Sequence, residues 1–335
     1  MRLSKIFERL VSAIPVALGV AILAFLFLRF LPGDPVEIML GATQATQQQI
    51  DSLRNQLHLD RPVLEQLWLF LVGLVQGDLG TSIVRGQPVA KLIGDSLPAT
   101  IELTRATIFI ALLIALPVGI ISALKAGSWL DRTVLSGALV GVSMPAFWFG
   151  LLLILLFSVE LQWLPTSGRI SATLLVPKVT GFMLIDTLLA RDLPAFWTAL
   201  KHLILPALTL GVVFAAVLAR VVRASMIEAL HKEYVTTARS KGLPEYTVVI
   251  KHALRNALIP ALTVTGLQFG ELLGGNMIVE TIFAWPGLGR LVVSSIFARD
   301  YVVVQTAVML YALTYVAANL VVDILYTYLN PRIEL

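Results

Sequence analysis

The sequence predicts an all-α polytopic membrane protein with six transmembrane helices. Two features of its composition point this way: 57% of the 335 residues are hydrophobic, and only 14% are charged. Soluble globular domains carry about 25% charged residues, so this chain has too little polar surface to face water on all sides. A third feature, a series of nearly charge-free runs about as long as a bilayer is thick, locates the helices.

The same composition excludes several classes of function. The net charge is +4 and the isoelectric point is about 9.4 because a few bases are in excess in a charge-poor chain, so we expect no nucleic-acid partner. The chain has no cysteine, which excludes disulfides and thiolate chemistry. Its four histidines are scattered, so neither a metal site nor a cofactor is predicted.

Six runs are long enough to cross about 30 Å of hydrocarbon. They are Leu10–Leu28, Ala106–Leu124, Thr133–Val159, Leu203–Ala219, Asn256–Val279 and Tyr301–Val322. The first run lacks the small-residue cleavage site of a signal peptide, so we expect it to remain as a helix. The apolar segment Leu67–Val75 is too short to span and is predicted to be an interfacial or packed helix.

The distribution of basic residues predicts the orientation. With the N-terminus inside, the inner segments hold 13 Lys and Arg in 66 residues, and the outer segments hold 12 in 141 residues. Because cytoplasmic loops are enriched in Lys and Arg, we expect both termini in the cytoplasm. Residues 220–255 contribute most of this signal and form the loop between the fourth and fifth runs.

The 220–255 loop reads as two helices joined by a turn. Good helix formers run from Ala224 to Ser240, Gly242 is placed to end that helix, and a second helical pattern begins at Glu245. The small residues Ala238 and Gly242 are four apart, which permits close approach of another element. Composition alone favours a different reading, an amphipathic helix lying on anionic membrane lipid.

The segment from Glu233 to Leu243, Glu-Tyr-Val-Thr-Thr-Ala-Arg-Ser-Lys-Gly-Leu, resembles the cytoplasmic "EAA" loop of ABC importer permeases. Ala238 and Gly242 match that pattern, whereas Thr236 and Thr237 replace its Glu and first Ala. These departures are typical of the dipeptide, oligopeptide and nickel branch of the family. Further motifs similar to that branch are Pro32-Gly33-Asp34-Pro35, Gly77-Asp78-Leu79-Gly80, Ser143-Met144-Pro145-Ala146-Phe147-Trp148, Glu280 to Gly289 and Asn330-Pro331-Arg332. The loop Gly181–Thr187 resembles the first permease subunit of dipeptide transporters in particular.

The resemblance implies a permease subunit of an ATP-driven dipeptide importer in the bacterial inner membrane. It implies a second homologous permease, two ATPase subunits, an external solute-binding protein and a small peptide substrate, with membrane lipid around the helices. The chain has no Gly-Lys dipeptide and therefore no phosphate-binding P-loop, so an ATPase must be supplied by a partner. The implied division is 1–96 for the first helix and a long external loop, 97–328 for the core permease domain, and 329–335 for a cytoplasmic tail.

The implied coupling residues lie in the 220–255 loop. They are Glu233, Tyr234, Thr237, Ala238, Arg239, Lys241 and Gly242. We predict no catalytic residue in this chain.

The fifth run contains the candidate pathway residues Glu271 and Asn276. A carboxylate inside a span is costly and usually faces a cavity or a partner, so Glu271 could line the translocation pathway or pair with a base such as Arg105 or Arg290. For Asn276 a helix–helix hydrogen bond is the better expectation. The run also carries Pro260 and four glycines, which favours a kinked helix.

Other readings remain open at this stage. The substrate could be an oligopeptide, glutathione or a nickel chelate, because similar permeases serve all of them. An ion-coupled secondary transporter is a rival, although the chain shows no inverted repeat. An intramembrane hydrolase is a second rival, but the chain lacks Gly-x-Ser-x-Gly and His-Glu-x-x-His.

Overall fold

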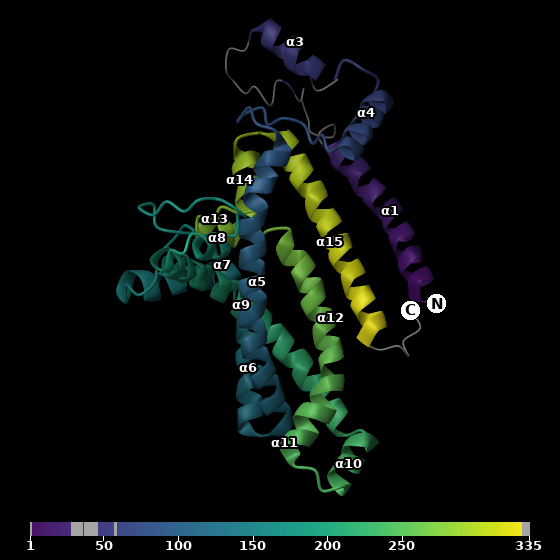
Figure 1. Ribbon diagram of the computed structural model, residues 1–335, viewed down its shortest axis with the longest axis vertical. Helices are drawn as coiled ribbons and strands as arrows, with labels where there is room; N and C mark the ends of the chain where they lie inside the picture. The colour runs from purple at the N-terminus through teal and green to yellow at the C-terminus, as the bar shows by residue number, and fades with distance from the viewer. Residues whose placement is uncertain (1, 28–35, 37–45, 57–58, 330–335) are drawn as a thin grey trace.

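A computed structural model describes residues 2–27, 36, 46–56 and 59–329. Within these residues the regular secondary structure is helical, apart from an isolated bridge between Thr81 and Pro88, and turns and loops join the helices. Figure 1 shows α5, α9 and α12 running along the long axis, with α3 and α4 at one end and α10 and α11 at the other. We call these the α4 end and the α10 end.

The helices have the following bounds, where η marks a π-helix. In chain order they are α1 (Arg2–Phe27), α3 (Gln47–Gln56), α4 (Val63–Gln76), α5 (Val89–Leu124), α6 (Trp129–Ser143), α7 (Ala146–Leu153), η1 (Ile154–Glu160), α8 (Met183–Leu189), α9 (Leu193–Leu230), α10 (Glu233–Ser240), α11 (Glu245–Thr247), η2 (Val248–Ala253), α12 (Leu254–Leu273), α13 (Met277–Ile282), α14 (Leu288–Phe297) and α15 (Tyr301–Leu329).

Within the described residues, three helices are long and apolar enough to cross a membrane: Val89–Leu124, Leu193–Leu230 and Tyr301–Val321. A fourth crossing is added if α6 and the α7–η1 helix are counted as one span. The first run lies in α1 as far as Phe27, and its last residue, Leu28, is outside the described residues; the apolar part of α1 is Ile14–Leu26. The predicted short helix is α4, which packs on α1 with the rings of Phe25 and Phe70 5.5 Å apart.

The run Thr133–Val159 is not one straight helix. Its two halves, Trp129–Ser143 and Ala146–Glu160, are bent by 101°. Pro145 lies at the break, and Met144 before it is extended, with φ −82° and ψ 127°. Proline disfavours the helical conformation of the residue before it, which explains why the helix ends there.

The run Asn256–Val279 is also interrupted. The helix α12 ends at Leu273, and Gly275 has φ +87° before α13 begins at Met277. At Gly270 an added Cβ would lie 2.8 Å from that of Ala318 in α15, and at Gly274 it would overlap the Tyr311 ring. These glycines therefore permit close packing of α12 on α15, rather than only a kink.

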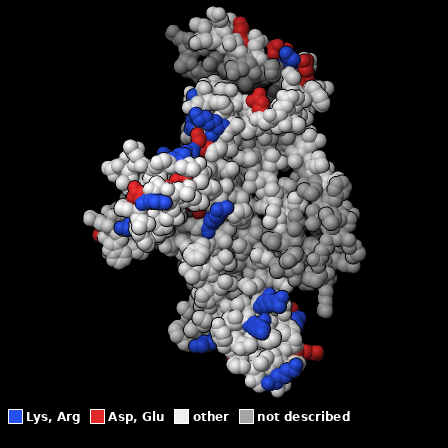
Figure 2. All heavy atoms as spheres, viewed as in Figure 1, with Lys and Arg blue, Asp and Glu red and all other residues white. Residues whose placement is uncertain are grey.

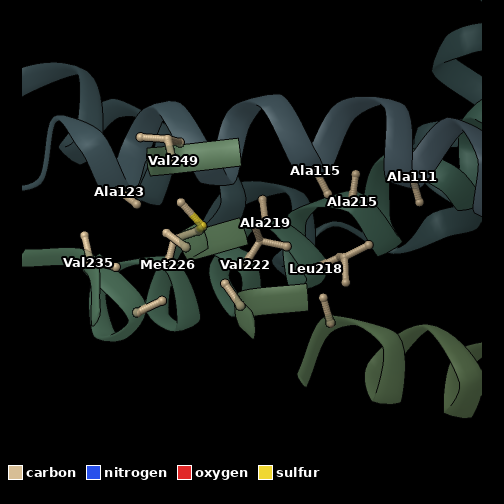
Figure 3. Packing of buried hydrophobic residues seen from close by; sticks show 14 of the residues in the cluster. Ala111, Ala115, Ala123, Ala215, Leu218, Ala219, Val222, Met226, Val235 and Val249 are labelled. Atoms are coloured by element: carbon tan, nitrogen blue, oxygen red, sulfur yellow. The ribbon is translucent and has the colours of Figure 1, made fainter. Parts of the chain in front are cut away.

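The core of the molecule is the pairing of α5 with α9, its most extensive helix contact. Figure 3 shows Ala111 and Ala115 of α5 facing Ala215 and Ala219 of α9, all of them buried. An added Cβ on Gly119 would lie 2.8 Å from Val222. Small residues let two helix backbones approach closely, which is the usual way that helices associate in a membrane.

The start of α5 adds a second feature to the fold. The helix is continuous from Val89 across the expected domain boundary at 96/97. Its first turns pack with Leu288 and Val292 of α14 and with Val303 of α15 in one buried cluster. The α4 end of the core is thus held together by residues from both sides of that boundary.

Candidate functional site

The 220–255 loop forms a compact helical hairpin at the α10 end. The helix α9 continues to Leu230, the chain turns at His231 and Lys232, and α10 then runs from Glu233 to Ser240. The predicted single helix over 224–240 is therefore broken in the middle. Lys232 has an extended ψ of 148°, which turns α10 away from the axis of α9. Figure 2 shows Lys and Arg side chains gathered at this end, whereas most of the face between α10 and α13 is uncharged.

One face of α10 is buried against the chain itself. Val235 and Ala238 are 0% and 5% exposed and lie in a cluster with Met226, Val248 and Val249. Ala238 therefore packs inward, and the element that approaches it closely is part of this chain. Its small size lets α10 lie against η2.

The opposite face is open. Six of the seven predicted coupling residues are exposed here, as are Thr236 and Ser240; the six are Glu233, Tyr234, Thr237, Arg239, Lys241 and Gly242. Two further exposed side chains, Leu243 and Tyr246, continue this surface, and Tyr246 is 77% exposed. We missed Tyr246 in the sequence, although an aromatic residue two positions after a Gly-x-Pro turn is a detectable sign of a presented side chain. We call the six coupling residues together with Leu243 and Tyr246 the hairpin face.

The turn of the hairpin is fixed by three local interactions. Gly242 has φ +73°, its N–H donates to the Arg239 carbonyl at 2.9 Å, and the Leu243 N–H donates to the Ala238 carbonyl at 3.4 Å. A glycine with positive φ is the common way to end a helix. Arg239 also donates two hydrogen bonds to the Glu245 carboxylate, at 2.6 and 3.2 Å. This bond raises the pKa of Arg239 and lowers that of Glu245.

A second ion pair anchors the base of the hairpin. Asp131 of α6 accepts hydrogen bonds from Arg223 of α9 at 2.6 and 2.7 Å, from the Gly127 N–H at 2.8 Å and from the Ser122 hydroxyl. The hydrogen bond from Arg223, followed by that from Ser122, holds the pKa of Asp131 far below its usual range. The sequence analysis missed this pair because Asp131 and Arg223 are remote in the chain.

The two candidate pathway residues are not on one helix. Glu271 lies near the end of α12, is exposed, and accepts a hydrogen bond from Gln268 at 3.0 Å. Asn276 lies beyond the break and caps α13, accepting from the Val279 N–H at 3.0 Å, so the expected helix–helix hydrogen bond is replaced by a cap.

Neither base suggested as a partner for Glu271 pairs with it. The Arg105 guanidinium lies 5.5 Å from the centre of the Phe182 ring, and Arg290 donates to the Ala284 carbonyl at 2.8 Å. Glu271 thus presents its carboxylate on a surface that the described part of this chain leaves uncovered.

A buried carboxylate that sequence reasoning missed lies in α13. Glu280 is 0% exposed and accepts hydrogen bonds from the Thr100 hydroxyl at 2.9 Å and the Arg290 N–H at 3.1 Å. A Cβ on Gly287 would lie 2.5 Å from its carboxylate, so the turn before α14 needs glycine there. Burial, only partly opposed by these hydrogen bonds, raises the pKa of Glu280 to about 7.

A second polar cluster joins the 160–192 segment to the same region. Arg169 donates two hydrogen bonds to Glu102 of α5, at 2.9 and 2.7 Å, and its guanidinium lies 5.8 Å from the ring centre of the buried Trp285. The Trp285 indole donates to the Ala99 carbonyl at 2.9 Å. The start of α5, the 160–192 segment and the α13–α14 turn thus form one connected unit. Within the described residues, no group of three or more potential metal ligands occurs.

Comparison with known proteins places this architecture in a family. A model described as binding-protein-dependent transport system inner membrane component matches residues 115–335. A second, described as the N-terminal part of a binding-protein-dependent transport system membrane component, matches residues 2–104. The two models together cover both the hairpin and the α13–α14 region.

Curated relatives match along nearly the whole chain. A di/tripeptide transport system permease protein of Pseudomonas aeruginosa is 47% identical over 332 residues, with 99% of both chains covered. A dipeptide transport system permease protein of Alkalihalophilus pseudofirmus is 43% identical over 327 residues, with 98% of both covered. A glutathione transport system permease protein of Escherichia coli is 44% identical over 332 residues, with 99% of both covered.

The family and the apolar helices together indicate a multi-pass protein of the inner membrane. The resemblance seen in the hairpin motif is confirmed by matches that extend over the whole sequence. The chain belongs to the ABC importer permeases, the inner membrane components of binding-protein-dependent transport systems.

Proposed function

We propose that this chain is a permease subunit of an ATP-driven dipeptide importer and forms half of its translocation pathway. The observation that carries the proposal is the full-length similarity to permeases whose names specify di/tripeptide or dipeptide transport. The partners are those of the family: a second homologous permease, two ATPases and an external solute-binding protein. Glutathione is the second candidate substrate, because a glutathione permease matches the chain at 44% identity.

The proposed topology has six crossings, made by α1, α5, the α6–η1 pair, α9, α12 and α15. In this arrangement the α10 end and both termini are cytoplasmic and the α4 end is external. Figure 1 supports it, since the first residues of α1 and the last of α15 lie at the same end of these two contacting helices. The division into 1–96, 97–328 and 329–335 stays a prediction, and α5 continues through its first boundary.

The hairpin face is proposed to dock on an ATPase subunit. The buried face of α10 packs on α9 and on η2, and η2 leads directly into α12. A force on the exposed face would therefore be transmitted to α9 and α12, two of the proposed membrane helices. Tyr234, Leu243 and Tyr246 supply apolar contact, and Glu233, Thr237 and Lys241 supply the polar rim expected of a protein interface. Arg239 and Gly242 shape the turn instead of supplying contact. A helix lying on anionic lipid is the competing reading.

Glu271 is proposed to line the pathway, where its carboxylate would meet a peptide ammonium group. Support comes from its exposure on α12 and from its hydrogen bond to Gln268, which leaves one carboxylate oxygen free of protein partners. A Glu271→Gln variant that assembles and transports normally would remove this role. We propose no pathway role for Asn276 beyond its cap on α13.

The function is tested by expressing the complete importer and measuring ATP-dependent uptake of a labelled dipeptide and of glutathione. Tyr246→Ala tests the docking of the hairpin, because it removes an exposed ring without touching Gly242. We expect it to reduce both copurification of the ATPase subunits and uptake. Trp129→Ala is the matched control, since Trp129 is also a 77% exposed aromatic residue at the α10 end but lies outside the hairpin.

The outcomes separate the readings. Uptake of dipeptide over glutathione supports the proposal, and the reverse preference favours the second candidate. Full ATPase capture by the Tyr246→Ala protein would favour the lipid-bound helix. Transport by the chain alone, without ATP, would replace the proposal with an ion-coupled secondary transporter.

A further inference from the structure

A small pocket bordered by two arginines opens at the α4 end, away from the hairpin and from Glu271. It has a volume of about 270 Å³ and lies between the 82–87 turn, the start of α5 and the first turns of α14. Its lining residues are Arg85, Ser96, Pro286, Gly287, Arg290, Leu291 and Ser294. Two guanidinium groups and two hydroxyl groups thus border one hollow. Figure 2 shows Lys and Arg side chains over the region where α14 meets the start of α5.

Neither guanidinium has a carboxylate partner among the residues that the structure describes. Arg85 donates to the Ser294 hydroxyl at 2.8 Å, and Arg290 donates to the Ala284 carbonyl at 2.8 Å. Both side chains are exposed and keep free N–H donors. Two arginines beside a pocket with no acid between them form a site for an anion supplied from outside.

Four acidic residues lie near the lining residues along the chain, and none pairs with either guanidinium. Asp78 accepts from the Gly80 N–H at 2.9 Å, and the buried Asp300 accepts from the Ser82 hydroxyl through one oxygen, while its Oδ1 has no partner among the described residues. Asp95, next to Ser96, forms an ion pair with Lys178. The Glu280 carboxylate accepts hydrogen bonds from the Thr100 hydroxyl and from the Arg290 backbone N–H, and not from a guanidinium. The positive charge of the pocket is therefore reduced by the buried Glu280 but is not neutralised by a salt bridge.

The surface around the pocket has the character of a protein interface. Arg290, Ser294 and Phe297 follow the spacing of one helical face of α14, and Phe297 is 84% exposed. Val84, on the turn that carries Arg85, is 54% exposed. Aromatic and arginine side chains are enriched in the central parts of protein interfaces, and both kinds surround this pocket.

We propose that this pocket receives an aspartate or glutamate side chain of the external solute-binding protein when that protein docks. The carboxylate would bridge the two guanidinium groups, and Phe297 and Val84 would pack against apolar residues beside it. The inference rests on the proposed function, because it needs the α4 end to be external and a binding protein to exist.

The test uses the complete importer in nanodiscs and a fluorescent form of the solute-binding protein that supports uptake. We expect Arg85→Gln and Arg290→Gln each to weaken binding about tenfold, with a smaller dependence of affinity on salt. Phe297→Ala should weaken binding without changing the salt dependence. ATPase activity in the absence of binding protein should stay at the wild-type level in all three. Arg191→Gln is the matched control, since Arg191 is an exposed arginine on the α8–α9 turn outside the pocket.

Three results would overturn the inference. One is wild-type affinity for the binding protein in both arginine variants. Another is that the arginine variants bind the solute-binding protein with wild-type affinity but take up a dipeptide less well than they take up its C-terminal amide. That result would make the pocket a substrate site. The last is a wild-type complex that neither binds the protein nor takes up peptide with ATP, which would remove the proposed function as well.

Discussion

Gly242 shows how a single residue in the hairpin can be required for a reason other than contact. A Cβ added there would meet nothing within 4 Å, so space is not the constraint. The constraint is its φ of +73°, which costs other residues about 1–2 kcal/mol and costs Asn less. A bulky substitution at Gly242 would therefore disturb the turn before it tested any partner.

This predicts a graded series at position 242. Gly242→Val should speed hydrogen exchange of the Leu243 amide on the order of tenfold, because strain opens the bond to the Ala238 carbonyl. Gly242→Asn should give a much smaller change. Exchange measured by mass spectrometry on the hairpin peptide checks both. Equal exchange in all three proteins would show that the positive φ is not what Gly242 supplies.

Glu280 gives the chain a pH-dependent contribution to stability. Its pKa is about 7 in the folded protein and 4.5 when unperturbed. Since the folded state holds the proton more tightly, the stability from this group is complete below about pH 4.5 and is lost as the pH rises through 7. The full difference corresponds to about 3 kcal/mol. Asp131 has a lowered pKa, so it acts in the opposite direction but only at more acidic pH.

Glu280→Gln should therefore flatten the pH dependence of unfolding. We expect the thermal midpoint of the wild-type chain in detergent to be higher at pH 5 than at pH 8, and the midpoint of the variant to change much less. Glu271→Gln serves as the control, because Glu271 is an exposed carboxylate in the neighbouring helix α12. An unchanged pH dependence in Glu280→Gln would mean that the buried carboxylate keeps an ordinary pKa.

At the scale of helices, sequence reasoning located apolar segments better than it described their geometry. Three of the six charge-free runs lie within α5, α9 and α15, but α5 and α9 are 36 and 38 residues long and extend well beyond their apolar runs. The bend at Pro145 and the end of α12 at Gly274 depend on tertiary packing as well as on local propensity. The motif in residues 233–243 located the hairpin, but the periodicity of these residues did not show that Ala238 faces inward. The Glu280 and Arg169 clusters join residues far apart in the chain, and one sequence carries no signal for such pairings.

The bend between α6 and α7 can be measured directly because the chain has no native cysteine. Spin labels at Trp129 and Val159, which are 77% and 52% exposed, report the two ends of the pair. A straight helix would separate them by about 45 Å at 1.5 Å per residue, whereas the 101° bend brings them to about 28 Å. We expect double electron–electron resonance spectroscopy to give the shorter distance. A distribution centred near the longer value would mean that the run crosses the membrane as one straight helix.

At the scale of the whole molecule, the chain exposes a large apolar surface that its own helices do not cover. Leu139, Val140, Leu151 and Leu155 of the bent pair are all exposed, at 49% or more. An apolar hollow of about 380 Å³ also lies between α12 and α15. In water such surface would drive aggregation, but lipid and a second permease can cover it. The packing of α5 on α9 thus forms the core of the subunit, and the outer apolar faces are available to the membrane and to the proposed partner subunits.

The proposed orientation of the molecule rests on where its basic residues lie, and it can be tested with single cysteines. Leu175 is 96% exposed in the 160–192 segment, and Tyr246 is 77% exposed on the hairpin. Because the positive-inside rule predicts a cytoplasmic hairpin and an external 160–192 segment, a membrane-impermeant maleimide should label Leu175→Cys in intact cells. It should label Tyr246→Cys only after the membrane is permeabilised. The unmodified chain is a clean background, since it contains no thiol. Labelling of Tyr246→Cys in intact cells would invert the topology, and it would place the two-arginine pocket on the side of the ATPases, where no external binding protein could reach it.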